Sequence, residues 1–224
     1  MTTQNDLKRQ AARRALDYLP NDDYIGVGSG STVSLFIEEL VAKKDRIRGV
    51  VAASLESREL LEKLGINVVA LADVGKLPVY FDGADEVNHS LQMIKGGGAA
   101  LLGEKIVAHA SRQFICMADE SKYVSKLGKF PLPVEVVPFA RSWVASQLVK
   151  LGGRPVWREG VITRGGHEIL DVHDLSIMEP MKLEDEINRI PGVMENGVFA
   201  RHPADVLVLG HPDRAEIITV GGAK

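Results

Sequence analysis

Three short polar segments, each directly after an apolar run, contain most of the residues that could do chemistry. They are GVGSGST (residues 26–32), FDGADE (81–86) and KGGG (95–98), the last of which continues into AALLGE (99–104). In open parallel α/β sheets, ligands bind beyond the carboxyl ends of the strands. Three polar loops that leave three such strands can therefore meet around one small molecule, and we expect them to form one site.

The first segment is typical of a phosphate-binding loop. Its glycines let backbone N–H groups point inward, its serines and threonine add hydroxyls, and a helix expected to begin near Thr32 presents the positive end of its dipole. The alternative is a tight strand-to-helix turn with a serine or threonine N-cap. A Walker A loop would need Gly-Lys-Ser/Thr here, and a dinucleotide fingerprint starting at Gly26 would need a glycine where Ser31 stands.

The second segment places three carboxylates, Asp82, Asp85 and Glu86, within five residues of an apolar strand end. A solvated acidic turn is one alternative. A metal site is another, although calcium loops place ligands at every second residue and no histidine pair at helical spacing accompanies these acids. Crowded carboxylates can have separated pKa values, which suits proton transfer between hydroxyl oxygens. We expect acid–base chemistry and no metal.

The third segment combines a lysine, a flexible loop and a candidate base. Lys95 precedes three glycines, and these lead into a helix whose first N–H groups could bind an oxyanion. Glu104 lies about one turn into that helix, in a stripe of apolar and small residues that should face the sheet: Ala100, Val107 and Ala108. A partly desolvated carboxylate makes a better general base near neutral pH. The alternative is a surface glutamate paired with Lys105.

Two further residues have chemically reactive side chains. Lys122 follows a fourth apolar run (114–118), so its ammonium could complete a phosphate site, the alternative being a solvated surface lysine. Cys116 lies inside that run and is expected in the core. The six histidines show no ligand spacing, and we assign them no role.

Composition places the chain among ordinary globular proteins. Hydrophobic residues make up 45% and charged residues 25% of the 224 residues. A net charge of −3 without a dense Lys/Arg block argues against a nucleic-acid surface or a polybasic membrane patch. The chain shows no stretch of membrane-spanning length and no secretory signal, and its single cysteine cannot form an internal disulfide. A cytoplasmic location fits best.

Strand-like and helix-like segments alternate after an amphipathic helix at 5–19. Strands are expected at 24–27, 49–53, 68–71, 79–81 and 114–118, and helices at 32–41, 57–64 and 99–111. That rhythm predicts an α/β fold: a Rossmann-like, mainly parallel sheet with helices on both faces.

The pattern changes near residue 130, where glycine and prolines interrupt it. Beyond it the order is strand 134–137, helix 140–151, strands 155–163 and 168–172, helix 183–190 and strand 197–201, which is the ferredoxin-like β-α-β-β-α-β arrangement. The apolar run 205–210 should rejoin the first sheet. We therefore predict a catalytic domain of residues 1–130 and 204–224, with a small α+β domain, 131–203, inserted in it.

In this order the motifs resemble the A type of ribose-5-phosphate isomerase. The motifs that carry the resemblance span nearly the whole chain: GSGST, DGADE, KGGGAA, EKIVA, DESK and GKFPLPVEV. The resemblance implies cofactor-free interconversion of D-ribose 5-phosphate and D-ribulose 5-phosphate in the non-oxidative pentose phosphate pathway, by a homodimer or homotetramer. The expected partner is a small sugar phosphate, and no nucleic-acid or membrane partner is expected.

The resemblance also assigns roles to residues. Glu104 matches the catalytic base, Asp82 and Asp85 the acidic loop, and Lys95 the start of the glycine-rich loop. The positions implied to contact substrate are Ser29, Gly30, Ser31, Thr32, Asp82, Gly83, Ala84, Asp85, Lys95, Gly96, Gly97, Gly98 and Lys122. Two departures stand out: Ser29 replaces a common threonine, and AASLE (52–56) replaces a loop richer in serine and aspartate.

The implied mechanism passes through an enediolate. The phosphate binds at residues 29–32 with Lys122, Asp82 or Asp85 assists ring opening and moves a proton between the two oxygens, and Glu104 carries the C2 proton to C1. Lys95 and the glycine amides stabilise the charge. Two other classes stay open: a sugar-phosphate-sensing module of a regulator, and another phosphosugar isomerase or deaminase.

Overall fold

The computed structural model describes residues 3–220, and its contacts divide them into two units. Unit 1 comprises residues 3–84, 103–123 and 204–220, and unit 2 comprises 85–102 and 124–203. Of the domain boundaries expected from the sequence, residues 1–2 and 221–224 lie outside the described part of the chain. Each unit has its own hydrophobic core.

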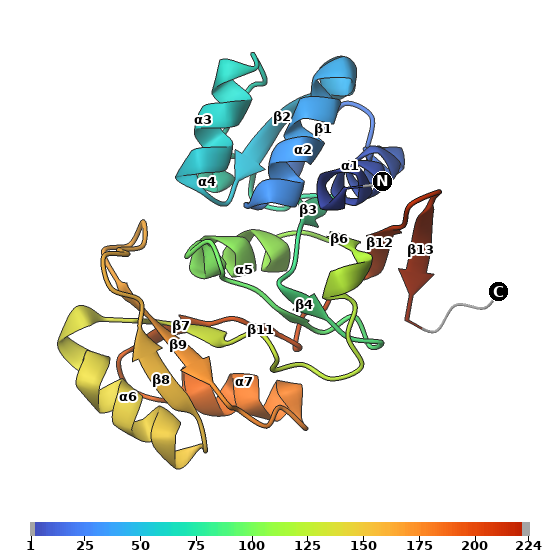
Figure 1. The fold of residues 1–224 in the computed structure, drawn as a ribbon. Coiled ribbons are helices and arrows are strands. Elements are labelled where there is room, and N and C mark those ends of the chain that lie inside the picture. Colours follow the sequence, from blue (N-terminus) through green and yellow to red (C-terminus); the bar gives the residue numbers. More distant parts are fainter. Residues whose placement is uncertain (1–2, 221–224) are drawn as a thin grey trace. The chain divides into compact units, whose positions relative to one another are not determined.

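Unit 1 is built on a six-stranded sheet (Figure 1). Its spatial order is β13-β12-β6-β3-β1-β2, and every neighbouring pair is parallel except β12 and β13. The strands are β1 (Asp23–Val27), β2 (Ile47–Ala52), β3 (Tyr80–Asp82), β6 (Phe114–Asp119), β12 (Val206–Gly210) and β13 (Ala215–Thr219). The mainly parallel sheet is confirmed, as is the return of the 205–210 run to it.

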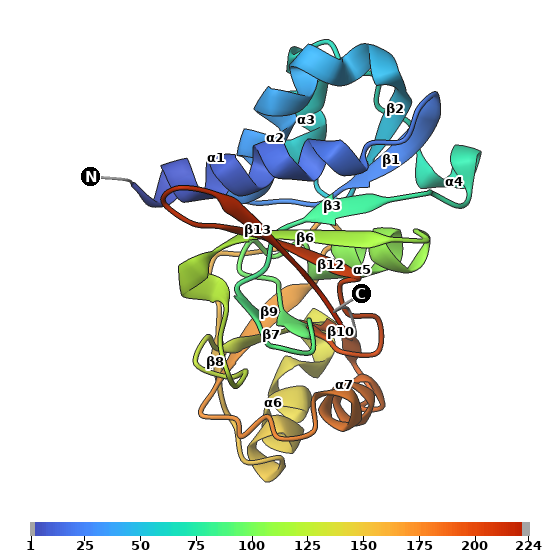
Figure 2. The ribbon, with the colours of Figure 1, turned by 90° about the vertical axis from the view of Figure 1, so that its right-hand side faces the viewer.

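Helices lie on both faces of this sheet, as expected (Figure 2). Ala11, Phe36 and Leu61, one from each of three helices, share a core cluster with Ile25 and Phe81 of the strands. The opposite face carries α5, whose Val107 lies beside β1. The helices are α1 (Gln4–Ala15), α2 (Ser31–Leu40), α3 (Leu55–Lys63), α4 (Leu71–Val74) and α5 (Leu101–His109), with short 3₁₀ turns η1 (Leu16–Tyr18), η2 (Val41–Arg46) and η3 (Glu120–Lys122).

Side-chain alternation along β3 decides which residues face α5. Phe81 stacks on Phe36 of α2, with ring centroids 4.6 Å apart. Tyr80, its neighbour, points to the other face, where a Cβ built on Gly26 would lie 2.9 Å from the Tyr80 ring and 2.6 Å from Val107. Because successive side chains in a strand alternate, Asp82 shares the face of Tyr80. A buried acid at the end of β3 therefore lies on the side of the sheet that α5 covers.

The prediction of a strand at residues 68–71 is wrong. Val68 forms only an isolated parallel bridge with Val50, and Leu71 begins the short helix α4. The apolar run was too short to distinguish a strand from a buried helical turn by its periodicity.

Unit 2 contains the ferredoxin-like arrangement. Its four-stranded antiparallel sheet has the order β10-β7-β9-β8, and the chain order of its elements is β-α-β-β-α-β, as expected. The elements are β7 (Leu132–Val136), η4 (Pro138–Ala140), α6 (Arg141–Lys150), β8 (Arg154–Trp157), β9 (Glu168–His173), α7 (Pro180–Asn188) and β10 (Val193–Asn196). The strand expected at 155–163 ends at Trp157, and the residues after it form a loop that leads to β9.

Residues 85–102 also belong to unit 2, whereas the sequence pattern places them in the first domain. The reason is a small three-stranded sheet of order β11-β5-β4, formed by β4 (Glu86–Val87), β5 (Met93–Ile94) and β11 (Val198–Phe199). β11 lies in the segment expected to complete the four-stranded sheet, but it pairs with β5 instead. Such short pairings leave no recognisable period in the sequence.

None of the helices within residues 3–220 combines the length and the apolar character that crossing a bilayer requires.

Candidate active site

Asp82 is the most constrained acid of unit 1. It ends β3, has no exposed surface, and its Oδ1 accepts hydrogen bonds from the N–H groups of Ser29 (3.1 Å) and Gly83 (2.7 Å). Its Oδ2 accepts a hydrogen bond from the Tyr80 hydroxyl at 2.5 Å. A Cβ at Gly28 would lie only 1.9 Å from the carboxyl carbon, so this close approach requires glycine. The carboxylate is thus held directly against the loop that follows β1.

Tyr80 is the side-chain donor that holds the Asp82 carboxylate. The ring is fully buried and packs on Phe114, with centroids 4.9 Å apart. Burial, followed by the nearby charges of Asp82 and Glu104, raises the pKa of the Tyr80 hydroxyl well above its ordinary value of 10. The hydroxyl therefore stays protonated and donates to Asp82. Tyr80 is not among the site residues expected from the sequence, although its position two residues before Asp82 on a strand signals a shared face.

Glu104 lies in the first turn of α5 and is 3% exposed. Its Oε1 accepts a hydrogen bond from the Ser29 hydroxyl at 2.5 Å. The preceding residue, Gly103, lets α5 approach the chain closely, since a Cβ there would lie 2.4 Å from the carbonyl oxygen of Ala53. A surface position for Glu104 is therefore excluded. Ser29 links the two acids, because its N–H contacts Asp82 and its hydroxyl contacts Glu104.

The loop after β1 leads into α2 through Gly30. This residue has a φ of +90°, in the region that favours glycine, and it is the N-cap of α2. The expected alternative, a turn capped by a serine or threonine side chain, is thus not what forms here. Ser31 and Thr32 begin the helix, and the loop presents backbone N–H groups at the positive end of its dipole.

One lysine of unit 1 contacts this loop, and the expected Lys122 follows another strand of the same sheet. Lys8 of α1 donates from Nζ to the Ser31 hydroxyl at 3.0 Å. Lys122 is half-buried in η3, directly after β6. The side chain of Gln4, one turn before Lys8, contacts Asp119 at the end of β6 at 3.3 Å, which ties α1 to that strand end. Lys8 was missed because nothing in a polar helix surface distinguishes the lysine that reaches a loop from its neighbours.

A second group of expected residues lies in unit 2. The Oδ2 atom of Asp85 accepts a hydrogen bond from the N–H of Gly97 at 2.9 Å, and a Cβ at Gly97 would lie 2.8 Å from Oδ1. Lys95 is 3% exposed, its N–H donates to the carbonyl of Gly197 at 2.9 Å, and its Nζ lies 5.4 Å from the centre of the Phe199 ring. Asp85 and the glycine-rich loop therefore form one organised cluster.

The sequence is similar to those of known proteins over nearly its whole length. The family model described as ribose 5-phosphate isomerase A (phosphoriboisomerase A) matches residues 49–214. The chain is 57% identical over 218 residues to "Ribose-5-phosphate isomerase A" of Neisseria meningitidis serogroup C, covering 97% of this chain and 98% of that one. It belongs to the ribose 5-phosphate isomerase A family.

Solved structures agree. The crystal structure of ribose 5 phosphate isomerase A from Neisseria gonorrhoeae has a TM-score of 0.96 and 57% identity, with 98% of each chain covered. A D-ribose-5-phosphate isomerase in complex with phospho-erythronic acid has a TM-score of 0.93 and 36% identity, covering 97% of this chain and 99% of that one.

The site residues expected from the sequence are divided between the two units of the fold. Ser29, Gly30, Ser31, Thr32, Asp82, Gly83, Ala84, Glu104 and Lys122 lie in unit 1, and Asp85, Lys95, Gly96, Gly97 and Gly98 lie in unit 2. The third acid of the acidic segment has a different place. Glu86 is buried and accepts the N–H groups of Gly128 and Phe130, each at 2.7 Å, so it fixes the loop before β7.

Among residues 3–220, the structure holds no group of three or more His, Cys, Asp or Glu side chains that could bind a metal ion. Cys116 is buried in β6, as expected.

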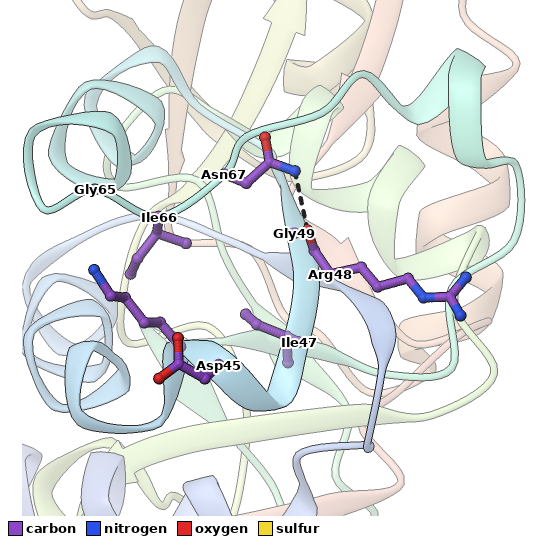
Figure 3. A pocket seen from close by; sticks show the side chains of 8 residues that line it. Asp45, Ile47, Arg48, Gly49, Gly65, Ile66 and Asn67 are labelled. Atoms are coloured by element: carbon purple, nitrogen blue, oxygen red, sulfur yellow. Dashed lines mark hydrogen bonds between the residues drawn. The ribbon is translucent and has the colours of Figure 1, made fainter.

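A pocket of about 160 Å³ lies elsewhere in unit 1, at the amino end of β2 (Figure 3). Its lining includes Ile47, Ile66 and Asn67, and the Asn67 side chain donates to the carbonyl of Arg48 at 2.9 Å. The expected site residues of unit 1 follow the carboxyl ends of strands, which form the opposite edge of the sheet. This pocket is therefore not the candidate active site.

The pH dependence of folding should reveal the buried Tyr80 hydroxyl. Because its pKa is higher in the folded than in the unfolded protein, its contribution to stability is complete below pH 10 and is lost at higher pH. Wild type should lose up to about 1.4 kcal/mol more unfolding free energy per pH unit above about pH 10 than Tyr80→Phe. Urea unfolding between pH 8 and 11 measures this, with the half-buried Tyr24→Phe as control. Equal alkaline losses in wild type and Tyr80→Phe would contradict the assignment.

Proposed function

We propose that the protein interconverts D-ribose 5-phosphate and D-ribulose 5-phosphate, a step of the non-oxidative pentose phosphate pathway. Family membership over nearly the whole chain supports this activity. The observation that carries the mechanism is that Ser29, in the loop between β1 and α2, connects two buried carboxylates, those of Asp82 and Glu104.

The loop of residues 29–32 is proposed to hold the phosphate of the sugar. The N–H groups at the start of α2 suit an anion, and Lys8 and Lys122 supply positive charge near strand ends of the same sheet. A relative that is 36% identical has been solved in complex with phospho-erythronic acid, a phosphorylated polyhydroxy acid. This supports a phosphosugar as the ligand.

Glu104 is proposed as the general base that removes the proton from C2 and returns it at C1. Its side chain is buried, and the Ser29 hydroxyl fixes the orientation of the carboxylate through Oε1. Asp82 is proposed to assist ring opening and to move the proton between the oxygens on C1 and C2. Its donors, Tyr80 and two backbone N–H groups, hold the carboxylate in one orientation.

The enediolate formed by proton removal carries negative charge that fixed donors must stabilise. We propose Lys95 and the amides of Gly96 and Gly98 for this task, with Asp85 as an alternative to Asp82 in ring opening. The Gly97 amide, which was also expected to contribute, already donates to Asp85. The buried ammonium of Lys95 and the Asp85–Gly97 hydrogen bond support a rigid arrangement. These residues need no metal or organic cofactor in the proposed steps.

Glu104→Gln tests the base. It keeps the size of the side chain and removes its basicity, so kcat should fall by about 10²- to 10⁴-fold. KM should stay within a few-fold, and exchange of the C2 proton with deuterated solvent should be lost to the same extent. Purified wild type is assayed with ribose 5-phosphate and, as the competing substrate class, glucosamine 6-phosphate.

The matched control is Glu59→Gln, the same change at an exposed glutamate of α3, which should leave kcat unchanged. Near-normal kcat in Glu104→Gln would contradict the assignment of the base. Turnover of glucosamine 6-phosphate instead of ribose 5-phosphate would overturn the proposed function itself.

Lys8→Met tests the phosphate site. Removal of one charge-assisted hydrogen bond to the phosphate should raise KM about tenfold, while kcat changes less than about threefold, because the phosphate is bound alike in ground and transition states. Competitive inhibition by inorganic phosphate should weaken in parallel. Lys63→Met, at an exposed lysine of α3, is the control. An unchanged inhibition constant for phosphate would exclude Lys8 from the site.

The protein is further proposed to act in the cytosol as a homodimer or homotetramer. Unit 2 exposes large apolar side chains, among them Phe139 (100% exposed) and Met178 (71%), which favour association. Sedimentation velocity at micromolar concentration should give a mass at least twice that of one chain. A single species of 24.4 kDa would contradict this proposal.

A further inference from the structure

Arg158 reaches the glycine-rich loop from a part of the chain that the sequence motifs leave out. It follows β8, in the loop that leads to β9. Its Nη1 donates to two successive carbonyl oxygens, those of Gly96 at 3.2 Å and Gly97 at 3.0 Å. All three residues lie in unit 2.

Asp171 of β9 fixes the guanidinium itself. Its Oδ2 accepts from Nε of Arg158 at 2.8 Å and its Oδ1 from Nη2 at 2.5 Å. Both side chains are less than one-fifth exposed. A two-pronged Arg–carboxylate pair has one preferred plane, so Nη1 is aimed at the loop in a defined direction.

The loop that carries Arg158 is itself anchored to the sheet. Glu135 of β7 is 1% exposed and its Oε1 accepts the Thr163 hydroxyl at 2.7 Å. The N–H of Thr163 donates to the carbonyl of His167 at 2.8 Å, which closes the turn before β9. Arg158 therefore extends from a braced segment.

The glycine-rich loop needs such support, because its backbone is strained. Gly96 has a φ of +104° and Ala99, which has a Cβ, a φ of +58°. A non-glycine residue in this region costs on the order of 1 kcal/mol or more and persists only when surrounding contacts hold it.

The hydrogen bonds hold one peptide plane of this loop from both sides. Gly96 C=O and Gly97 N–H belong to the same trans peptide and point in opposite directions. The carbonyl accepts from Arg158, and the N–H donates to Asp85 at 2.9 Å. The next peptide has its Gly97 carbonyl on Arg158, so its N–H, that of Gly98, is directed away from the guanidinium.

We propose that Arg158, oriented by Asp171, is a positioning residue for catalysis: it sets the two peptide planes of residues 96–98, and with them the direction of the Gly98 N–H, so that this amide stabilises the enediolate. It contacts neither the sugar nor the reacting atoms. This inference rests on the proposed isomerase function and adds to it a residue that acts through the loop.

Arg158→Lys and Asp171→Asn test the inference. Lysine keeps the charge but has no planar fork to bond Asp171 and two carbonyls together, so kcat should fall about 10- to 100-fold while KM changes less than about threefold. Asp171→Asn should also lower kcat, because it removes the carboxylate that orients Arg158. The control is Arg154→Lys in β8, which alters the exposed Arg154–Asp174 pair and should leave kcat within twofold of wild type.

The affinities of two inhibitors distinguish a positioning role of Arg158 from a general role in stabilising the fold. Phospho-erythronic acid has a carboxylate where the sugar has its reacting carbonyl, so its inhibition constant should rise about tenfold in Arg158→Lys. The inhibition constant of inorganic phosphate should not change. Wild-type kcat in both variants, or equal weakening of both ligands, would overturn the inference. Absence of isomerase activity in wild type would instead overturn the proposed function.

Discussion

The burial of the Asp82 carboxylate is the constraint on which unit 1 depends. An ion removed from water must regain its hydrogen bonds from the protein, and Asp82 does so through Ser29, Gly83 and Tyr80. This buried position in turn limits the residues around it: Tyr80 must stay protonated to donate, and Gly28 must lack a side chain because a Cβ there would clash with the carboxylate. The loop after β1 is therefore shaped by the acid at the end of β3, and through Ser29 this order extends to Glu104.

Unit 2 solves a different problem, the stability of a strained loop. Its glycine-rich segment has few side chains of its own, so its conformation depends on groups brought from elsewhere in the sequence. Asp85 holds an amide and Arg158 holds two carbonyls. Fixed dipoles need no reorganisation when charge develops, which is the physical reason that a rigid loop stabilises an oxyanion better than a flexible one.

Much of the fold could be predicted because it depends on local patterns. Alternating strand and helix segments indicated the parallel sheet, and the order of elements after residue 130 indicated the ferredoxin-like arrangement. Apart from the strand expected at 155–163, which ends at Trp157, the errors lie where segments are short. Residues 68–71 make a single bridge, and β4, β5 and β11 pair over two residues each, so no period marks them.

The sequence by itself determined the chemical types available: a phosphate-suited loop, an acidic loop, a lysine before glycines and a glutamate on an apolar stripe. It did so because polar segments directly after apolar runs mark the carboxyl ends of strands, where open parallel α/β sheets bind their ligands. Only the tertiary structure decided which groups act on them. Lys8 and Arg158 reach their targets through helix packing and through a loop far along the chain. Side chains of these types are common enough that position in space alone distinguishes them.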